Sequence, residues 1–320
     1  VGSEMCIRDR FVTGVAGQLG HDVMNELNKR GYEGVGSDLA PEYSGIQDST
    51  AVTTMPYISV DITDASAVEK AITEAGVDGV VHCAAWTAVD AAEDEDNQEI
   101  VRKVNVLGTE NIAKVCKKLG IKMMYLSTDY VFDGQGTTPW EPDCKAYKPL
   151  NVYGQTKLDG ELAVYNNVDK FFIIRIAWVF GKNGKNFIKT MINLGKTHDT
   201  LSVVNDQIGT PTYTYELARI LIDMIETEKY GYYHATNEGG YISWYDFTKE
   251  IFRQAAAMGH PEYLPENMTV NSVTTAEYGA SKAARPFNSR LDKSKLTANG
   301  FTPLPTWQDA LGRYLKELDF

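Results

Sequence analysis

The sequence predicts an α/β fold in which a doubly wound parallel sheet carries helices on both faces and a smaller C-terminal region follows. Two observations lead to this prediction. Short apolar runs alternate with amphipathic stretches, and a glycine-rich turn stands between the first run and the first amphipathic stretch. Strands that alternate with helices form βαβ units, and such units place their strands in parallel.

The predicted strands are short and apolar, and the helices between them have one apolar face. The strand-like runs cover residues 32–38, 57–60, 79–83, 123–127 and 171–177. Stretches with the helical repeat cover residues 21–30, 65–75 and 98–119. Asp64 is a good N-cap for the second of these helices, and Gly76 and Gly120 are typical residues at which a helix ends.

The alternation loosens after Trp178. Helical patterns recur at residues 214–226, 244–258 and 307–318, among loops rich in Gly, Pro, Asn and Thr, and residues 263–289 are the most irregular. We expect residues 11–180 to form the doubly wound domain and residues 181–320 mainly the smaller region, with some segments returning to the first domain. Residues 1–10 lack an initiator Met and place charges where a buried strand is expected, so we interpret them as a non-native leader.

Composition excludes several classes of protein. The 320 residues carry a formal net charge of −12, which argues against a general binder of nucleic acid or of anionic membranes. The four cysteines are far apart and form no CxxC pair, so a disulfide scaffold and a zinc ribbon are not expected. Such cysteine usage fits a reducing compartment, and we expect a cytoplasmic location. No apolar stretch is long enough to span a bilayer.

The glycine-rich turn predicts a phosphate-binding site. Gly14, Gly17 and Gly20 follow one another at intervals of three residues. Glycine permits a tight turn, and it lets a diphosphate approach the backbone N–H groups at the start of the next helix. A turn that only packs the helix on the strand is the alternative.

Asp38 ends the next predicted strand, at about the 20-residue offset where an acid bonds the adenosine ribose of a dinucleotide. A carboxylate there repels a 2′-phosphate, and the neighbouring side chains offer no cation to hold one. We therefore expect NADH to be preferred over NADPH. The alternative role for Asp38 is to cap a turn after the strand.

A Tyr-x-x-x-Lys spacing places a phenol and an ammonium on one helical face, where the charge is expected to lower the pKa of the tyrosine. The chain contains this spacing at Tyr153, Tyr245 and Tyr278. Tyr153 is favoured because it follows the strand that ends in Ser-Thr-Asp, and ligands bind at the carboxyl edge of an open parallel sheet. Thr128 at that edge can donate to a substrate carbonyl, or it can simply start a turn. A serine hydrolase is not expected, because no GxSxG elbow is present.

Seven segments carry a resemblance to a known family. They read GQLG at 17–20, AAWTAVD at 84–90, STDYVF at 127–132, LNVYGQTKL at 150–158, WVF at 178–180, VNDQ at 204–207 and NSRL at 288–291. In this order they resemble an extended short-chain dehydrogenase/reductase, which has a Rossmann-type sheet, and within that superfamily the dTDP-4-dehydrorhamnose reductases.

The resemblance implies an oxidoreductase of nucleotide-sugar metabolism. Its reaction would be the reduction of the C4 ketone of dTDP-4-dehydrorhamnose to dTDP-rhamnose by NADH or NADPH, in the synthesis of rhamnose for cell-surface polysaccharide. Tyr153 would be the general acid, Lys157 would hold the nicotinamide ribose and tune Tyr153, and Thr128 would polarise the ketone. The resemblance also admits use of Mg²⁺ and a homodimer, although no cluster of metal ligands is evident in the sequence.

The binding residues are assigned by the same resemblance. With the glycine turn, the cofactor residues would be Gly14, Gly17, Gln18, Leu19, Gly20, Asp38, Asp61, Ile62, Ala85, Trp86, Thr87, Tyr153 and Lys157. Thr128, Asp129 and Trp178 would contact the sugar. Arg285 and Arg290 are candidates for binding the nucleotide diphosphate, because an anionic substrate needs a cation and both lie in or near a matching segment.

Two other functions remain open. Proteins with this resemblance also serve as non-catalytic, nucleotide-binding regulatory subunits, which have no need of Thr128, Tyr153 and Lys157 together. A nucleotide-sugar epimerase shares the fold and the Tyr-Lys pair but requires tightly held NAD⁺. Dehydratases of this type carry an Asp-Glu pair after the catalytic threonine, whereas Asp129 is followed here by Tyr130, which favours simple reduction.

Overall fold

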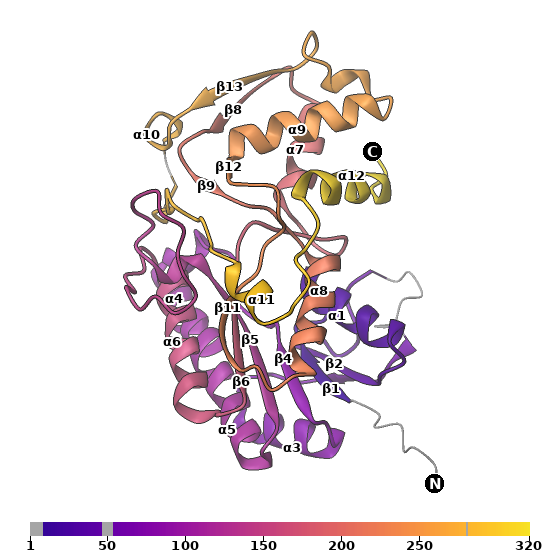
Figure 1. The fold of residues 1–320 in the computed structure, drawn as a ribbon, viewed down its shortest axis with the longest axis vertical. Helices are drawn as coiled ribbons and strands as arrows, with labels where there is room; N and C mark the ends of the chain where they lie inside the picture. The colour runs from indigo at the N-terminus through magenta and orange to yellow at the C-terminus, as the bar shows by residue number, and fades with distance from the viewer. Residues whose placement is uncertain (1–8, 47–53, 280) are drawn as a thin grey trace.

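A sheet of seven parallel strands forms the centre of the molecule (Figure 1). The computed structural model describes residues 9–46, 54–279 and 281–320. The strand order is β11-β6-β5-β4-β1-β2-β3, so the chain builds the sheet outward from β1 in one direction and from β4 in the other. Such a switch point opens a crevice outside the carboxyl ends of the strands. The α/β fold class predicted from the sequence is confirmed.

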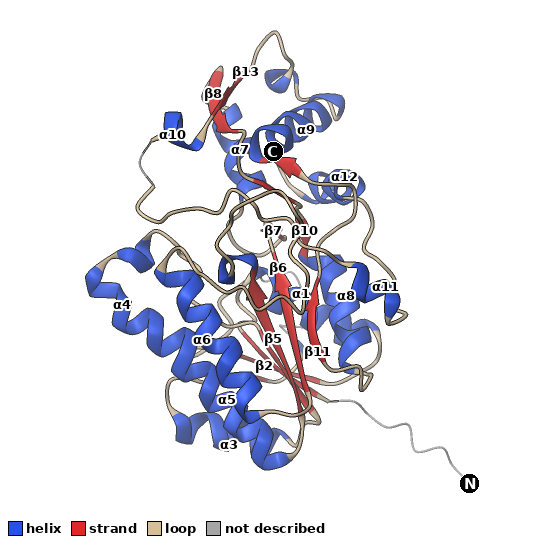
Figure 2. Cartoon of the chain, turned by 60° about the vertical axis from the view of Figure 1, so that its left-hand side comes forward, coloured by secondary structure: helices blue, strands red, loops and turns tan. Residues whose placement is uncertain are grey.

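Helices cover both faces of this sheet (Figure 2). The strands are β1 (Arg10–Thr13), β2 (Gly34–Asp38), β3 (Tyr57–Ser59), β4 (Gly79–His82), β5 (Lys122–Thr128), β6 (Phe171–Ile176) and β11 (Gly231–His234). One face carries α1 (Gln18–Lys29), α8 (Thr214–Ile225) and α11 (Ser294–Ala298). The other carries α3 (Ala65–Ala75), α4 (Glu95–Arg102), α5 (Thr109–Leu119) and α6 (Val152–Asn167). Short helical turns are η1 (Ala91–Glu93), η2 (Lys103–Gly108) and η3 (Asp129–Val131).

Successive residues of the strands enter two different cores. Val12 and Met124 pack under α1 and α8, while their neighbours Phe11 and Met123 pack under α3 and α5. All four side chains are buried. A strand that is buried on both faces is apolar at most positions, which is why these segments read as nearly continuous apolar runs in the sequence.

A second region covers the carboxyl edge of the sheet and has its own core (Figure 1). Its helices are α7 (Phe187–Gly195), α9 (Trp244–Ala257), η4 (Pro261–Tyr263), α10 (Thr275–Tyr278) and α12 (Trp307–Glu317). Its strands are β7 (Val179–Phe180), β8 (Thr200–Val204), β9 (Ile208–Gly209), β10 (Thr212–Tyr213), β12 (Ile242–Ser243) and β13 (Thr269–Val273), which pair as β7 with β10, β8 with β13 and β9 with β12.

The chain crosses between the two regions more than once. β11 extends the central sheet beside β6, and α8 packs against α1, so parts of residues 181–320 belong to the first domain. At the other end, Arg10 is the first residue of β1 and pairs with Gly34 and Gly79. The strand thus begins at the last residue of the predicted leader, whose residues 1–8 lie outside the described residues.

The helix ends predicted from the sequence are confirmed. The Asp64 side chain accepts a hydrogen bond from the N–H of Ala67 at 3.1 Å, and Gly76 and Gly120 end their helices in the left-handed region, with φ of 63° and 65°. The single helix predicted for residues 98–119 consists of α4 and α5 joined by the π-helical turn η2. Within the described residues, the structure has no helix of the length and apolarity needed to cross a membrane.

Candidate active site

A pocket of about 1030 Å³ lies at the carboxyl edge of the sheet, where the strand order switches between β4 and β1. This volume is at the upper end of the ~300–1,000 Å³ range of small-molecule sites, which leaves room for a large ligand or for two adjoining ones. The predicted residues that line it are Gly14, Gly17, Gln18, Leu19, Gly20, Asp38, Asp61, Ile62, Ala85, Trp86, Thr87, Thr128, Asp129, Tyr153, Lys157, Trp178 and Arg285. Arg290 does not line it.

The turn between β1 and α1 needs glycine at two positions. Gly14 has φ of 70°, and a Cβ atom there would lie 2.7 Å from the backbone N of Ala84. A Cβ on Gly20 would lie 2.3 Å from the carbonyl oxygen of Gly14. Among the described residues, no side chain caps the N-terminus of α1 at Gly17. The first N–H groups of the helix therefore face the pocket uncapped, which suits an anionic ligand.

Asp38 lies at the end of β2 and holds the glycine turn. Its Oδ2 accepts a hydrogen bond from the N–H of Ala16 at 2.9 Å, and its Oδ1 accepts from the N–H of Leu39 at 2.8 Å. The turn-capping role and the ribose-binding role are compatible, because a carboxylate has about four acceptor positions and the side chain lines the pocket.

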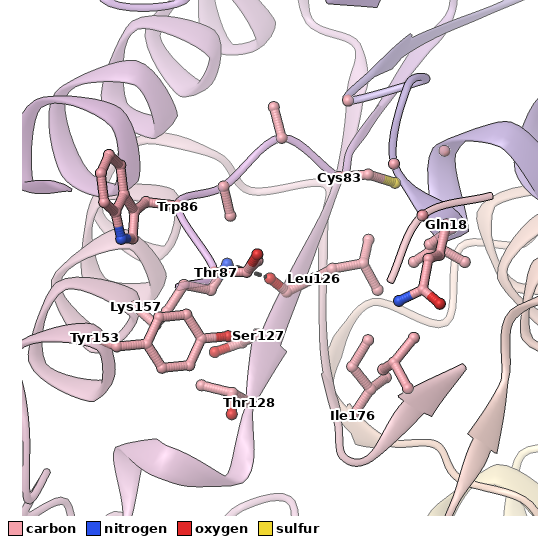
Figure 3. Close-up of a pocket in the computed structure, with 18 of the residues that line it drawn as sticks. Gln18, Cys83, Trp86, Thr87, Leu126, Ser127, Thr128, Tyr153, Lys157 and Ile176 are labelled. Atoms are coloured by element: carbon pink, nitrogen blue, oxygen red, sulfur yellow. Dashed lines mark hydrogen bonds between the residues drawn. The ribbon is translucent and has the colours of Figure 1, made fainter. Parts of the chain in front are cut away.

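Tyr153 belongs to the first turn of α6, which Asn151 caps by accepting from the N–H of Gly154 at 2.7 Å. The phenol points toward the end of β5, where Ser127 and Thr128 lie (Figure 3). Burial raises the pKa of Tyr153 to about 12, the charge of Asp129 adds to the rise, and a hydrogen bond with Thr128 opposes it. The direction is opposite to the one expected from the sequence, so the phenol is protonated at neutral pH.

Lys157 does not lower the pKa of Tyr153 as the sequence suggested, because its ammonium is bound to other groups. Its ammonium donates to the backbone carbonyl of Leu126 at 2.7 Å and lies over the ring of Tyr125, with Nζ 4.4 Å from the ring centroid (Figure 3). Burial lowers the pKa of Lys157 to about 8. The two other tyrosines with the same spacing, Tyr245 in α9 and Tyr278 in α10, do not line the pocket.

Three buried polar atoms of residues that line the pocket have no hydrogen-bond partner among the described residues. They are Oγ of Ser127, Oδ2 of Asp129 and Nη1 of Arg285. Burial raises the pKa of Asp129 to about 6. The other terminal nitrogen of Arg285, Nη2, donates to Asp90 at 2.9 Å. Arg290 instead donates to the Asn288 side chain at 3.1 Å, so the structure brings one of the two predicted arginines to the pocket.

An aromatic wall belongs to the second region. Trp178 has φ of 52°, the only left-handed backbone among the described non-glycine residues, a conformation that costs about 1–3 kcal/mol. Its ring stacks on Trp244 with 3.6 Å between centroids, and a Cβ on Gly209 would lie 3.0 Å from it. Trp244 begins α9 and lines the same pocket, but its position far along the chain gave no signal in the sequence.

Two asparagines that the sequence analysis missed hold the pocket together. The π-helical turn η2 places Asn105 where its Oδ1 accepts from the N–H of Trp86 at 2.8 Å and its Nδ2 donates to Thr156 at 3.0 Å. Asn183 donates to the carbonyl of Ala16 at 2.8 Å and so ties the glycine turn to the second region. Both amides act across large sequence separations, which spacing alone does not reveal.

In the described part of the chain, no group of three or more His, Cys, Asp or Glu side chains is arranged to hold a metal ion. The cations that line the pocket are Lys157, Lys185 and Arg285. The recognition chemistry of the site therefore rests on backbone N–H groups, a few cations and hydroxyl or carboxylate groups.

Comparison with known proteins gives a consistent result. The family described as RmlD substrate binding domain matches residues 9–320. A dTDP-4-dehydrorhamnose reductase from Salmonella typhimurium is 39% identical over 263 residues, which cover 81% of this chain and 85% of that protein. The crystal structure of a dTDP-4-dehydrorhamnose reductase from Clostridium acetobutylicum superposes with a TM-score of 0.84 at 36% identity, over 98% of this chain and 100% of that one. The enzyme from Bacillus anthracis in complex with NADP gives 0.82 at 35% identity, over 97% and 99%.

The fold and the pocket define an α/β enzyme of the extended short-chain dehydrogenase/reductase type. The matched family and the relatives then place it more narrowly. The chain belongs to the RmlD family, that of the dTDP-4-dehydrorhamnose reductases.

Proposed function

We propose that this protein reduces the C4 ketone of dTDP-4-dehydrorhamnose to dTDP-rhamnose with a nicotinamide dinucleotide, in nucleotide-sugar biosynthesis. One observation carries the proposal. Thr128, Tyr153 and Lys157 line the pocket at the carboxyl edge of the sheet, the same pocket that the glycine turn lines. A regulatory subunit that only binds a nucleotide has no use for this set.

The pocket fits a dinucleotide cofactor. A close approach at Gly14 and the uncapped N-terminus of α1 provide room and N–H donors for a diphosphate, and Asp38 is placed to accept from ribose hydroxyls. Lys157 would hold the nicotinamide ribose. The cofactor supplies the hydride that reaches C4 of the sugar.

Tyr153 provides the proton. With its pKa raised to about 12, the phenol keeps its proton at neutral pH and can give it to the oxygen that forms at C4. Thr128, at the end of β5, donates a hydrogen bond to the same oxygen and polarises the ketone.

The unpartnered buried atoms suit the nucleotide sugar. Asp129 Oδ2 can accept from a sugar hydroxyl, and Arg285 Nη1 can donate to a phosphate oxygen. Trp178 offers an apolar ring to the sugar. This arrangement supports Arg285, rather than Arg290, as the cation for the diphosphate.

Three finer assignments belong to this proposal. Asp38 favours NADH over NADPH, because its carboxylate repels a 2′-phosphate. A homodimer agrees with the resemblance to the family. A cytoplasmic location agrees with that resemblance and with three described cysteines that are free. A requirement for Mg²⁺ has no support from the side chains of the described residues.

The test is a spectrophotometric assay of NADH oxidation with dTDP-4-dehydrorhamnose, run beside the corresponding UDP sugar. We expect oxidation with the dTDP sugar and a rhamnose nucleotide as product. Nucleotide binding without oxidation of NADH indicates the regulatory subunit instead. A tightly bound dinucleotide in the purified protein, together with C4 or C5 inversion of a nucleotide sugar, indicates the epimerase.

A further inference from the structure

A buried ion pair joins α6, the helix that carries Tyr153 and Lys157, to β6 of the central sheet. Arg175 of β6 is fully buried, and Glu161 of α6 is 1% exposed. Nε of Arg175 donates to Glu161 Oε1 at 3.0 Å, and Nη2 donates to the same oxygen at 2.8 Å. The remaining guanidinium donors reach the carbonyl of Pro142 at 3.0 Å and the hydroxyl of Tyr147 at 3.1 Å. Arg175 therefore has partners on several sides and holds one carboxylate in a fixed position.

This carboxylate lies one helical turn after Lys157. Residues four apart on a helix are neighbours on one face, so Glu161 and Lys157 share the buried face of α6. The Lys157 ammonium contacts a backbone carbonyl and an aromatic ring, and the Glu161 carboxylate attracts it electrostatically from one turn further along the helix. Neither the carbonyl nor the ring carries a charge, so they offset only part of the cost of burying a cation.

The other titratable groups around Lys157 are neutral at pH 7. Burial lowers the pKa of His82 to about 3, so its imidazole is uncharged. Burial raises the pKa of the Cys83 thiol to about 12 and that of the Tyr125 phenol well above its usual value. Tyr153 keeps its proton as described above. On the far side of Glu161, Arg175 is the cation with which that carboxylate pairs.

We propose that Glu161, clamped by Arg175, is a positioning residue for the reaction: it supplies the buried negative charge that keeps Lys157 protonated and seated on the Leu126 carbonyl. Arg175 contributes by pairing with the Glu161 carboxylate. Burial raises the pKa of Glu161, and the Arg175 guanidinium, whose Nη2 lies 2.8 Å from the carboxylate, opposes that rise and favours the ionised form. The inference rests on the proposed function, in which the charged Lys157 binds the nicotinamide ribose.

A purely structural ion pair makes a different prediction. If Glu161 and Arg175 only join α6 to β6, replacing Glu161 lowers stability and reduces activity by the same factor at every pH. If Glu161 keeps Lys157 charged, the loss grows as the pH rises, because the ammonium loses its proton at a lower pH.

The first experiment follows Lys157 itself. In protein labelled with ¹³C at lysine Cε, the Lys157 resonance is assigned by its absence in Lys157→Met and is titrated from pH 6 to 10. We expect the pKa of Lys157 to fall by about one unit in Glu161→Gln, and to stay near that of the wild type in Glu161→Asp. The same midpoint in wild type and Glu161→Gln overturns the proposal. This readout needs no turnover, so it stands or fails separately from the reductase activity.

The second experiment measures kcat/KM and the Kd for NADH across the same range. In Glu161→Gln both are expected to change less than threefold at pH 6, about fivefold at pH 8 and close to tenfold at pH 9, as the protonated fraction of Lys157 falls. The matched control is Asp159→Asn, which removes the same charge from the same helix but from an exposed pair with Arg102. A loss that does not vary with pH, or an equal effect of the control, contradicts the proposal.

A third variant covers the case in which Glu161→Gln does not fold. Glu161→Gln with Arg175→Met removes both charges of the pair, so Arg175 is not left as an unpaired buried cation, and replacement of a buried pair is often tolerated. The proposal predicts the same downward shift of the Lys157 titration. An unchanged titration in the folded double variant contradicts it.

Discussion

Burial sets the protonation state of single residues in this site. It raises the pKa of Tyr153 to about 12, lowers that of Lys157 to about 8 and raises that of Asp129 to about 6. Each change favours the neutral form, because a charged group loses its hydration in the interior. A protonated phenol at Tyr153 suits a reaction that ends in protonation of an alkoxide.

Tyr153→Phe tests the proton donor. The substitution removes one hydroxyl from a half-buried ring that lines the pocket, so we expect kcat to fall by about 10²–10⁴-fold while the Kd for NADH changes little. Steady-state assays and NADH fluorescence titration measure the two quantities. The matched control is Tyr245→Phe, which has the same Tyr-x-x-x-Lys spacing outside the pocket and is expected to keep normal turnover. Near-normal turnover of Tyr153→Phe contradicts the assignment.

Asp38→Asn tests the choice of cofactor at one charge. Two like charges about 4 Å apart repel by roughly 1 kcal/mol in water and more near a protein surface. Neutralising Asp38 is therefore expected to raise kcat/KM for NADPH, relative to NADH, by about tenfold. Asp64→Asn, at an N-cap that does not line the pocket, is expected to leave the ratio unchanged. A preference of the wild-type protein for NADPH contradicts the proposed role of Asp38 in cofactor choice.

At the scale of elements, the β1–α1 turn joins the cofactor site to the sheet. Gly20 has no room for a side chain, because its Cβ would meet the carbonyl of Gly14. The loop that follows β7 adds a second contact, since the Gln18 side chain accepts from the N–H of Gly181 at 2.8 Å. A shift of the turn therefore displaces both the first turn of α1 and the second region.

Gly20→Ala is expected to weaken NADH binding at least tenfold and to lower the free energy of unfolding by about 1–3 kcal/mol, because the backbone must move to admit a methyl group. Gly31→Ala is the control. Gly31 has φ of 73° but open space around it, so alanine there costs about 1–2 kcal/mol of backbone strain and leaves the Kd for NADH unchanged. Equal Kd values in the two variants contradict the steric argument.

At the scale of the whole molecule, two neutral histidines are built into the interior. His82 lies between the hydroxyls of Thr13, at 2.7 Å, and Thr109, at 3.0 Å. The Nε2 atom of His234 faces Nη1 of Arg175 at 3.2 Å, so it accepts a hydrogen bond and carries no proton. Burial, reinforced by Arg175, lowers the pKa of His234 well below its usual value.

This burial predicts a pH dependence of stability. A histidine whose folded-state pKa is lowered binds fewer protons folded than unfolded, so stability is present above pH 6.5 and is lost as the pH falls below it. Each such group contributes about 1.4 kcal/mol per pH unit. We expect urea unfolding at pH 7.5, 6 and 5 to show a slope smaller by about this amount in His234→Gln. The surface variant His198→Gln is expected to keep the wild-type slope. Parallel curves for wild type and His234→Gln contradict the prediction.

The net charge of −12 is a property of the whole molecule, and it bears on how anionic ligands can bind. An acidic protein must bind an anionic cofactor and an anionic substrate through local groups. The pocket provides these as the N-terminus of α1 and the cations Lys157, Lys185 and Arg285. The acidic surface lies outside this recognition.

The sequence by itself determined the α/β class, the glycine turn, the helix caps at Asp64 and Gly120, and the Tyr153–Lys157 pair, because these depend on residues close together in the chain. Turn geometry and helical spacing act locally, so they can be read from order alone. The choice among three Tyr-x-x-x-Lys pairs was also accessible, because the strand that precedes Tyr153 indicates the sheet edge.

Only the tertiary structure decided the remaining features. It placed Arg285 rather than Arg290 in the lining of the pocket, and it brought Asn105 to Trp86 and Asn183 to the glycine turn. It also returned β11 to the central sheet and reversed the expected pKa direction of Tyr153. Each of these depends on burial or on contacts between segments far apart in the chain. Such contacts form only when the two regions pack together, and no local pattern of residues specifies them.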